Sequence, residues 1–83
     1  MVVDYLEAIR LNPGLVQAYN NRGRAYYCLK QYDRAISDYN EAIRLNADFA
    51  AAYTNRASAY RVLGNTERAH QDFKKAKELE ANQ

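Results

Sequence analysis

Two segments of this sequence carry hydrogen-bonding and charged side chains at helical spacing. In the first segment they are Gln17, Asn20, Asn21, Arg24 and Tyr27. In the second they are Thr54, Asn55, Ser58 and Arg61. Amides and hydroxyls donate and accept hydrogen bonds, and a guanidinium adds positive charge with a forked set of donors. Such residues suit an extended peptide with backbone amides and an acidic group or a C-terminal carboxylate. The alternative is that they are solvated polar positions without a ligand.

No pattern in the sequence is typical of catalysis. A Ser-His-Asp grouping, a Gly-rich phosphate loop, CxxC and HExxH are all missing. Glu7, Asp38 and Glu41 are most simply solvated or ion-paired. His70 has no partner at metal-ligand spacing, and the only cysteine, Cys28, is interpreted as a small apolar filler near a groove. We therefore expect no enzyme activity, no cofactor and no metal site.

The charge of the chain is nearly balanced, with a formal net charge of +2. Lys and Arg are scattered instead of forming the dense block of a nucleic-acid-binding tail, so we expect no nucleic-acid partner. No apolar run approaches the roughly 20 residues of a membrane span. The start, "MVVDYLEAIR", lacks the features of a signal peptide. We therefore expect no membrane association and a cytoplasmic location.

The sequence repeats itself at a constant offset. "AYNNRGRAYYCL" at 18–29 returns as "AYTNRASAYRVL" at 52–63. "DYNEAIRLN" at 38–46 is preceded by "DYLEAIRLN" at 4–12, which differs only at Leu6. A period of about 34 residues is typical of stacked supersecondary units. The sequence therefore holds half a unit, one full unit and one further unit.

Apolar residues within each unit follow helical spacing, and no stretch alternates as a strand does. The predicted helices cover 2–11, 14–29, 32–45, 48–63 and 66–80. Asn12, Asn46 and Asn65 are predicted N-caps, and Gly64 is a predicted left-handed C-cap with Lys30 as a weaker version of that turn. Because the joints are short, successive helices are expected to run antiparallel.

The unit resembles a tetratricopeptide repeat, whose pattern is W-x₂-L-G-x₂-Y, then A-x₃-F, then P. The residues that match or replace this pattern are Tyr5, Ala8 and Pro13 in the half unit, Tyr19, Arg22, Gly23, Tyr26, Ala35, Tyr39 and Ala42 in the first full unit, and Tyr53, Arg56, Ala57, Tyr60, Ala69, Phe73 and Ala76 in the second. The resemblance implies an all-α fold, in which antiparallel helix hairpins stack as a short right-handed α-solenoid. Its parts are a partial repeat at 1–12, a full repeat at 13–46 and a full repeat at 47–83.

The family also implies a function. First helices of tetratricopeptide repeats line a concave groove, so the nine polar residues above become predicted peptide-binding residues of a protein-interaction module. Some members clamp the C-terminal carboxylate of chaperones with Lys and Asn. Asn21 and Asn55 match the Asn slot, but Asn20 stands in a Lys slot, and Gln17 and Ala51 supply no cation. A full clamp is therefore not expected.

The two ends of the stack are expected to differ. Ile36 and Ile43, whose slots face the next unit in this family, become His70 and Lys77 in the last helix, so its edge is polar. The first helix has no preceding partner, and its apolar face at Val2 and Tyr5 would be bare. Two explanations stay open: a fragment of a longer array, or a chain that associates with itself through this helix. In the second, stacking between chains is itself the function, as a structural scaffold.

Repeated residues are expected to form the packing layer. Ala and Gly allow close helix approach, while tyrosine rings, Leu29 and Leu63 fill the remaining space, and Ile9 and Leu11 cover the helix after them. Arg22 and Arg56 occupy a normally apolar slot and need partners. At one constant spacing an Asp follows each arginine (Asp38, Asp72), and at another an Asp precedes each (Asp4, Asp38). We predict that at least one of these two registers forms ion pairs.

Overall fold

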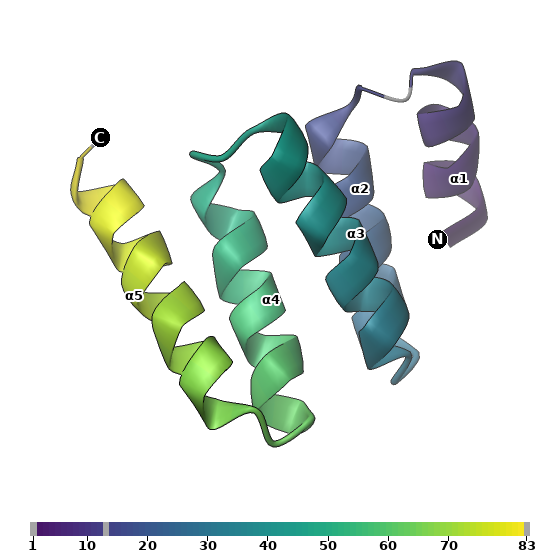
Figure 1. The fold of residues 1–83 in the computed structure, drawn as a ribbon. Helices are drawn as coiled ribbons and strands as arrows, with labels where there is room; N and C mark the ends of the chain where they lie inside the picture. The colour runs from purple at the N-terminus through teal and green to yellow at the C-terminus, as the bar shows by residue number, and fades with distance from the viewer. Residues whose placement is uncertain (1, 13, 83) are drawn as a thin grey trace.

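The computed structural model describes residues 2–12 and 14–82, with side chains from Glu7 onward. Over these residues the chain forms five α-helices and no strand: α1 (Val2–Leu11), α2 (Val16–Cys28), α3 (Tyr32–Leu45), α4 (Ala50–Val62) and α5 (Thr66–Ala81). They follow one another as a stack with α1 and α5 at opposite ends (Figure 1). Each helix packs against the next one in sequence, and α2 also touches α4. The predicted all-α stack of antiparallel hairpins is confirmed.

The helix starts at α2 and α4 correct the sequence prediction, because each helix begins two residues later than expected. The side-chain oxygen of Asn12 accepts a hydrogen bond from the amide of Gly14 at 3.3 Å, and that of Asn46 accepts one from Asp48 at 3.1 Å. These are local turns in which the asparagine bonds the backbone two residues on. Asn12 and Asn46 therefore shape the joints and do not cap the helices.

The joints inside the two hairpins share one backbone geometry. Lys30 and Gly64 both have a positive φ, 62° and 82°. The amides of Gln31 and Asn65 each bond the carbonyl five residues back at 2.9 Å, which satisfies the ends of α2 and α4. The side chain of Asn65 also accepts a hydrogen bond from the amide of Arg68, so its predicted N-cap is confirmed. Lys30 thus holds a conformation that glycine adopts more easily.

Small residues bring the helices close together, as predicted. The fully covered alanines are Ala35, Ala42, Ala52, Ala57 and Ala59. Between α2 and α3 the approach is so close that a Cβ on Gly23 would lie 2.6 Å from the ring of Tyr39. Tyr39 itself keeps only 1% of its surface exposed. The core of this small stack is therefore a seam of alanines closed by one large ring.

The large aliphatic residues at helix ends contradict the predicted packing layer. Leu29 and Leu63 are about half exposed, and Leu11 is 71% exposed, while Ile9 is buried as expected. All three leucines lie at the last position of a helix or just after it, where no described element covers them. At the polar edge of the stack, His70 and Lys77 are exposed as predicted. The predicted bare face at Val2 and Tyr5 falls outside the described side chains.

Each hairpin contains a two-pronged ion pair between a half-buried Arg and a buried Asp. Arg22 bonds Asp38 through its Nε and Nη2 at 2.8 and 2.6 Å, and Arg56 bonds Asp72 at 2.8 Å through both. These hydrogen bonds outweigh burial and raise the pKa of both arginines above the ordinary value. The register in which the Asp follows its Arg along the chain is therefore confirmed, and each pair joins the two helices of one hairpin.

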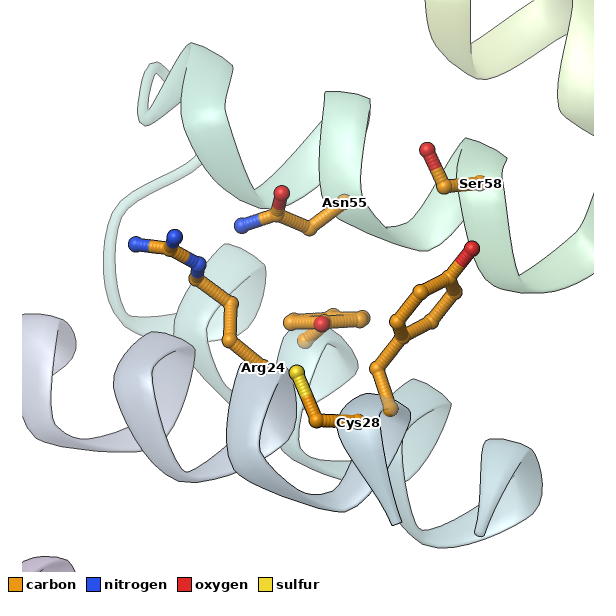
Figure 2. A pocket seen from close by; sticks show the side chains of 6 residues that line it. Arg24, Cys28, Asn55 and Ser58 are labelled. Carbon is orange, nitrogen blue, oxygen red and sulfur yellow. The ribbon is translucent and has the colours of Figure 1, made fainter. Parts of the chain in front are cut away.

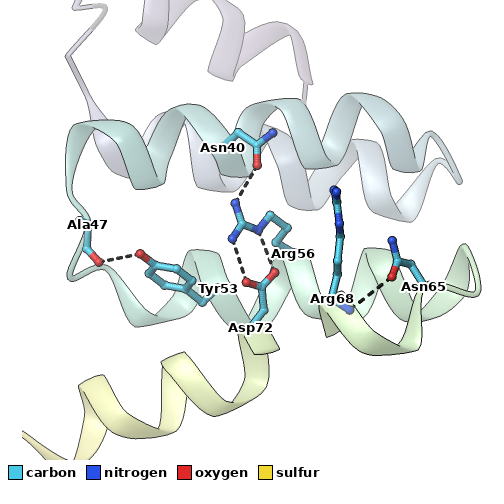
Figure 3. A network of polar contacts seen from close by, with 7 residues as sticks. All are labelled: Asn40, Ala47, Tyr53, Arg56, Asn65, Arg68 and Asp72. Atoms are coloured by element: carbon cyan, nitrogen blue, oxygen red, sulfur yellow. Dashed lines mark hydrogen bonds and ion pairs between the residues drawn. The ribbon is translucent and has the colours of Figure 1, made fainter. Parts of the chain in front are cut away.

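The other register is not formed where it can be checked. In place of Asp38, the amide oxygen of Asn40 accepts a hydrogen bond from Arg56 at 2.9 Å and links α3 to α4 (Figure 3). The corresponding pair of Asp4 with Arg22 lies outside the described side chains. Arg56 therefore ties three helices together: α3, α4 and α5.

Candidate functional site

The candidate site is an open pocket where α2 and α4 meet above α3. Its volume is about 270 Å³, and its lining residues are Arg24, Tyr27, Cys28, Tyr39, Asn55 and Ser58. Arg24 and Cys28 project from one helix toward Asn55 and Ser58 on another (Figure 2). The pocket exists because the first helices of two successive hairpins touch. Four of the nine predicted site residues therefore come together here: Arg24, Tyr27, Asn55 and Ser58.

The other five predicted residues lie outside this pocket. Gln17 and Arg61 are exposed, Asn21 and Thr54 are half-buried, and Asn20 is only 5% exposed. The guanidinium of Arg61 lies 5.4 Å from the centre of the Phe73 ring, on the last hairpin. These residues share helix faces with the pocket residues, but the structure does not gather them into one site.

Asn20 was predicted to bind a peptide, but its side-chain amide is buried and already bonded to another side chain. Its side-chain oxygen accepts a hydrogen bond from the amide nitrogen of Asn55 at 3.0 Å. Burial and this bond give Asn20 a positioning role, because it holds the Asn55 side chain at the pocket. The sequence alone could not show this, because the two asparagines are 35 residues apart.

The polar groups of the pocket are chiefly donors. Arg24 is exposed and has no ion pair among the described residues, unlike Arg22 and Arg56. Asn55 uses one amide hydrogen on Asn20 and keeps the second. The hydroxyl of Ser58 bonds the carbonyl of Thr54 in its own helix at 3.3 Å. A cation and a spare amide donor make this pocket suited to an oxygen acceptor with negative charge.

Tyr39 is the pocket residue that sequence reasoning missed, because its ring was assigned to packing alone. The ring does fill the core, yet the residue also lines the pocket. Burial raises the pKa of Tyr39 above its ordinary value, so the hydroxyl keeps its proton. One signal was available: Phe73 stands at the equivalent position of the next unit, so the hydroxyl is a difference between otherwise matched units.

Cys28 lines the pocket, as expected for a residue near the groove, but it is exposed and so does not act as the predicted apolar filler. Across residues 2–12 and 14–82, His, Cys, Asp and Glu side chains form no group of three that could hold a metal ion. None of the helices described is both long and apolar enough to cross a membrane.

Comparisons with known proteins identify relatives of this architecture. Family models described as tetratricopeptide repeat match residues 16–49 and 38–71. The chain is 33% identical to the first such domain of Spaghetti (RPAP3), solved with the HSP90 peptide SRMEEVD; the match covers 99% of this chain and 65% of that one, with a TM-score of 0.94. The corresponding domain of Arabidopsis OM64 gives 32% identity, coverages of 99% and 68%, and a TM-score of 0.94.

A third solved structure, MamA, is 32% identical over 98% of this chain, with a TM-score of 0.92. This chain spans about half the length of MamA and about two thirds of the other two. No curated protein sequence matches the chain.

Proposed function

Because this chain belongs to the tetratricopeptide repeat family, we propose that it is a protein-interaction module that binds a peptide segment of its partner along α2 and α4. The segment carries a carboxylate, which enters the pocket between the two helices. The observation that carries this proposal is Arg24: it is the only charged residue of the pocket lining and has no ion pair among the described residues.

The charge of the pocket lining supports an acidic ligand. No lining residue is acidic, and Asn55 adds an amide donor beside the guanidinium of Arg24. The comparison with Spaghetti points the same way, since the peptide solved with that domain, SRMEEVD, contains three acidic residues. In this chain the slot of the clamp lysine holds the buried Asn20, so attraction of the carboxylate falls to Arg24 instead.

Fluorescence anisotropy with a labelled SRMEEVD peptide tests this function. We expect saturable binding, and we expect Arg24→Gln to weaken it at least fivefold. Arg34→Gln is the matched control, because Arg34 is an exposed arginine of α3 outside the pocket and its loss changes the net charge equally. Equal losses from the two variants would mean that only overall charge matters, and the proposed site would be wrong.

Light scattering on the same samples separates this function from the structural scaffold in which chains stack on one another. A monomer at the concentrations used for binding supports the interaction module. Concentration-dependent growth in mass that persists with saturating peptide would favour the scaffold instead.

A further inference from the structure

The hydroxyl of Tyr39 is the starting point. Tyr39 keeps only 1% of its surface exposed, yet its hydroxyl makes no hydrogen bond within the part of the chain that the structure describes. In that same part, no fully covered side-chain nitrogen or oxygen lacks a partner. The hydroxyl of Tyr39 therefore keeps part of that small surface, and the cavity that Tyr39 lines is the pocket beside Arg24.

Tyr53 shows how a buried tyrosine hydroxyl can be satisfied within this fold. Tyr53 is also buried, and its hydroxyl donates to the carbonyl of Ala47 at 2.9 Å. A phenol that is nearly covered and has no protein partner loses most of its solvation without replacement. A ligand group that accepts a hydrogen bond at the floor of the pocket would supply what is missing.

The surroundings of Tyr39 select the kind of acceptor. The hydroxyl keeps its proton, so it donates, and among the described residues that line the pocket Arg24 is the only charged one. Asp38, the nearest carboxylate in sequence, is taken up by Arg22. One cation and two neutral donors match a group with a single negative charge and two acceptor oxygens.

We propose that Tyr39 is a ligand-binding residue: its hydroxyl donates a hydrogen bond to one oxygen of a carboxylate that Arg24 attracts into the pocket. The idea that a peptide carries this carboxylate rests on the proposed function, but the carboxylate site itself does not. Within the part of the second hairpin that the structure describes there is no such site, because Phe73 lacks the hydroxyl and Arg61 lies over its ring. Tyr39 thus makes the first full repeat different from the second in what it binds.

Sodium acetate is the simplest probe of this site. In NMR titrations at constant ionic strength, acetate in place of chloride should shift the side-chain amide signals of Asn55 in a saturable way. A hydrogen bond to a charged acceptor contributes about 1.5 kcal/mol or more, so Tyr39→Phe should weaken acetate binding about tenfold. Acetate shifts that match those of chloride, or that survive unchanged in Tyr39→Phe, would overturn the proposal.

Tyr53→Phe is the matched control. It removes a hydroxyl that bonds the backbone, outside the pocket, so it should lower thermal stability and leave acetate binding unchanged. Tyr39→Phe should weaken acetate binding and leave thermal stability nearly unchanged, because the hydroxyl of Tyr39 bonds nothing in the described part of the protein. This opposite pattern distinguishes a ligand-binding hydroxyl from a structural one, and loss of acetate binding in both variants would refute it.

The peptide then identifies the source of the carboxylate. The effect of Tyr39→Phe is measured on SRMEEVD, on its C-terminal amide and on a version in which all three acidic side chains become amides, both Glu to Gln and Asp to Asn. Loss of the effect on C-terminal amidation assigns the terminal carboxylate, and loss with the side-chain amides assigns a side chain; either supports the proposal. An effect of equal size on all three peptides contradicts it. If acetate binds through Tyr39 but SRMEEVD does not bind at all, the peptide proposal fails and the carboxylate site stands.

Discussion

The hairpins α2–α3 and α4–α5 share their packing residues but present different surfaces. Both contain the Arg–Asp pair and the covered alanines. In the first hairpin, Tyr39 lies beneath α4 and lines a pocket; in the second, Phe73 sits at the polar edge with Arg61 over its ring. The repeated residues hold a hairpin together, whereas the pocket also needs a neighbouring hairpin and the residues that differ between the copies.

Three pairs of equivalent residues differ between the hairpins in ways that a single substitution can test. Gly23 of the first hairpin corresponds to Ala57 of the second, Tyr39 to Phe73, and Lys30 to Gly64. A fourth difference is in the number of partners, because Arg56 bonds Asn40 as well as its aspartate. Each of these differences leads to an experiment in which the two hairpins should respond unequally.

The ion pairs should show the largest effect. Asp38→Ala leaves the half-buried Arg22 without a carboxylate and should lower the free energy of unfolding by about 3 kcal/mol. Asp72→Ala should cost about 1 kcal/mol less, because Arg56 keeps its hydrogen bond to Asn40. Urea unfolding followed by circular dichroism measures both. Equal costs would show that Asn40 does not help to stabilise Arg56.

Gly23 should show the next largest effect, and the sign of the change in the free energy of unfolding is informative. Ala is the better helix former, so Gly23→Ala would stabilise an isolated helix by about 1 kcal/mol. In this fold the new methyl group would overlap the ring of Tyr39, and we expect a net loss of about 2 kcal/mol in the free energy of unfolding. Ala57→Gly in the second hairpin should cost about 1 kcal/mol through helix propensity. A thermal melt in which Gly23→Ala is the more stable protein would refute the close approach of α2 and α3.

Alkaline pH should separate Tyr39 from Phe73. Burial raises the pKa of Tyr39 in the folded state, so above about pH 10 the unfolded chain gives up this proton first and stability falls as pH rises. Between pH 9 and 11 the wild type should lose about 1.4 kcal/mol more than Tyr39→Phe, which shares every other titrating group. Urea unfolding at the two pH values tests this, and identical losses would argue against a buried phenol.

The turn residues should show the smallest effect. Lys30 holds a left-handed conformation that costs a residue with a Cβ about 1 kcal/mol. Lys30→Gly should therefore raise the free energy of unfolding by about 0.5 kcal/mol after the extra chain entropy of glycine is counted, while Gly64→Lys should lower it by a similar amount. Thermal melts of the two variants provide the measurement. Shifts of the same sign would mean that the two joints differ in geometry.

The features predicted correctly from sequence are those that depend on neighbours within one hairpin. Helical spacing located the helices to within two residues at their ends. Arg22 and Asp38 lie on the two helices of one hairpin, joined by a short loop, so an ion pair between them could be expected. The sequence could not decide whether each Arg pairs with the Asp that follows it or with the one that precedes it. The small residues repeated at Ala35 and Ala69 were correctly assigned to the seam.

By itself, then, the sequence determined the repeat, its helices and the residues that hold each hairpin closed, because regular spacing in the chain becomes regular placement on a helix face. Tertiary structure decided what happens between hairpins. It buried Asn20 against Asn55, left Leu29 exposed at the end of its helix, and made Tyr39 both a core residue and part of a pocket. Those outcomes depend on side chains that are distant in the sequence, whose approach only the packing of one hairpin on the next can establish.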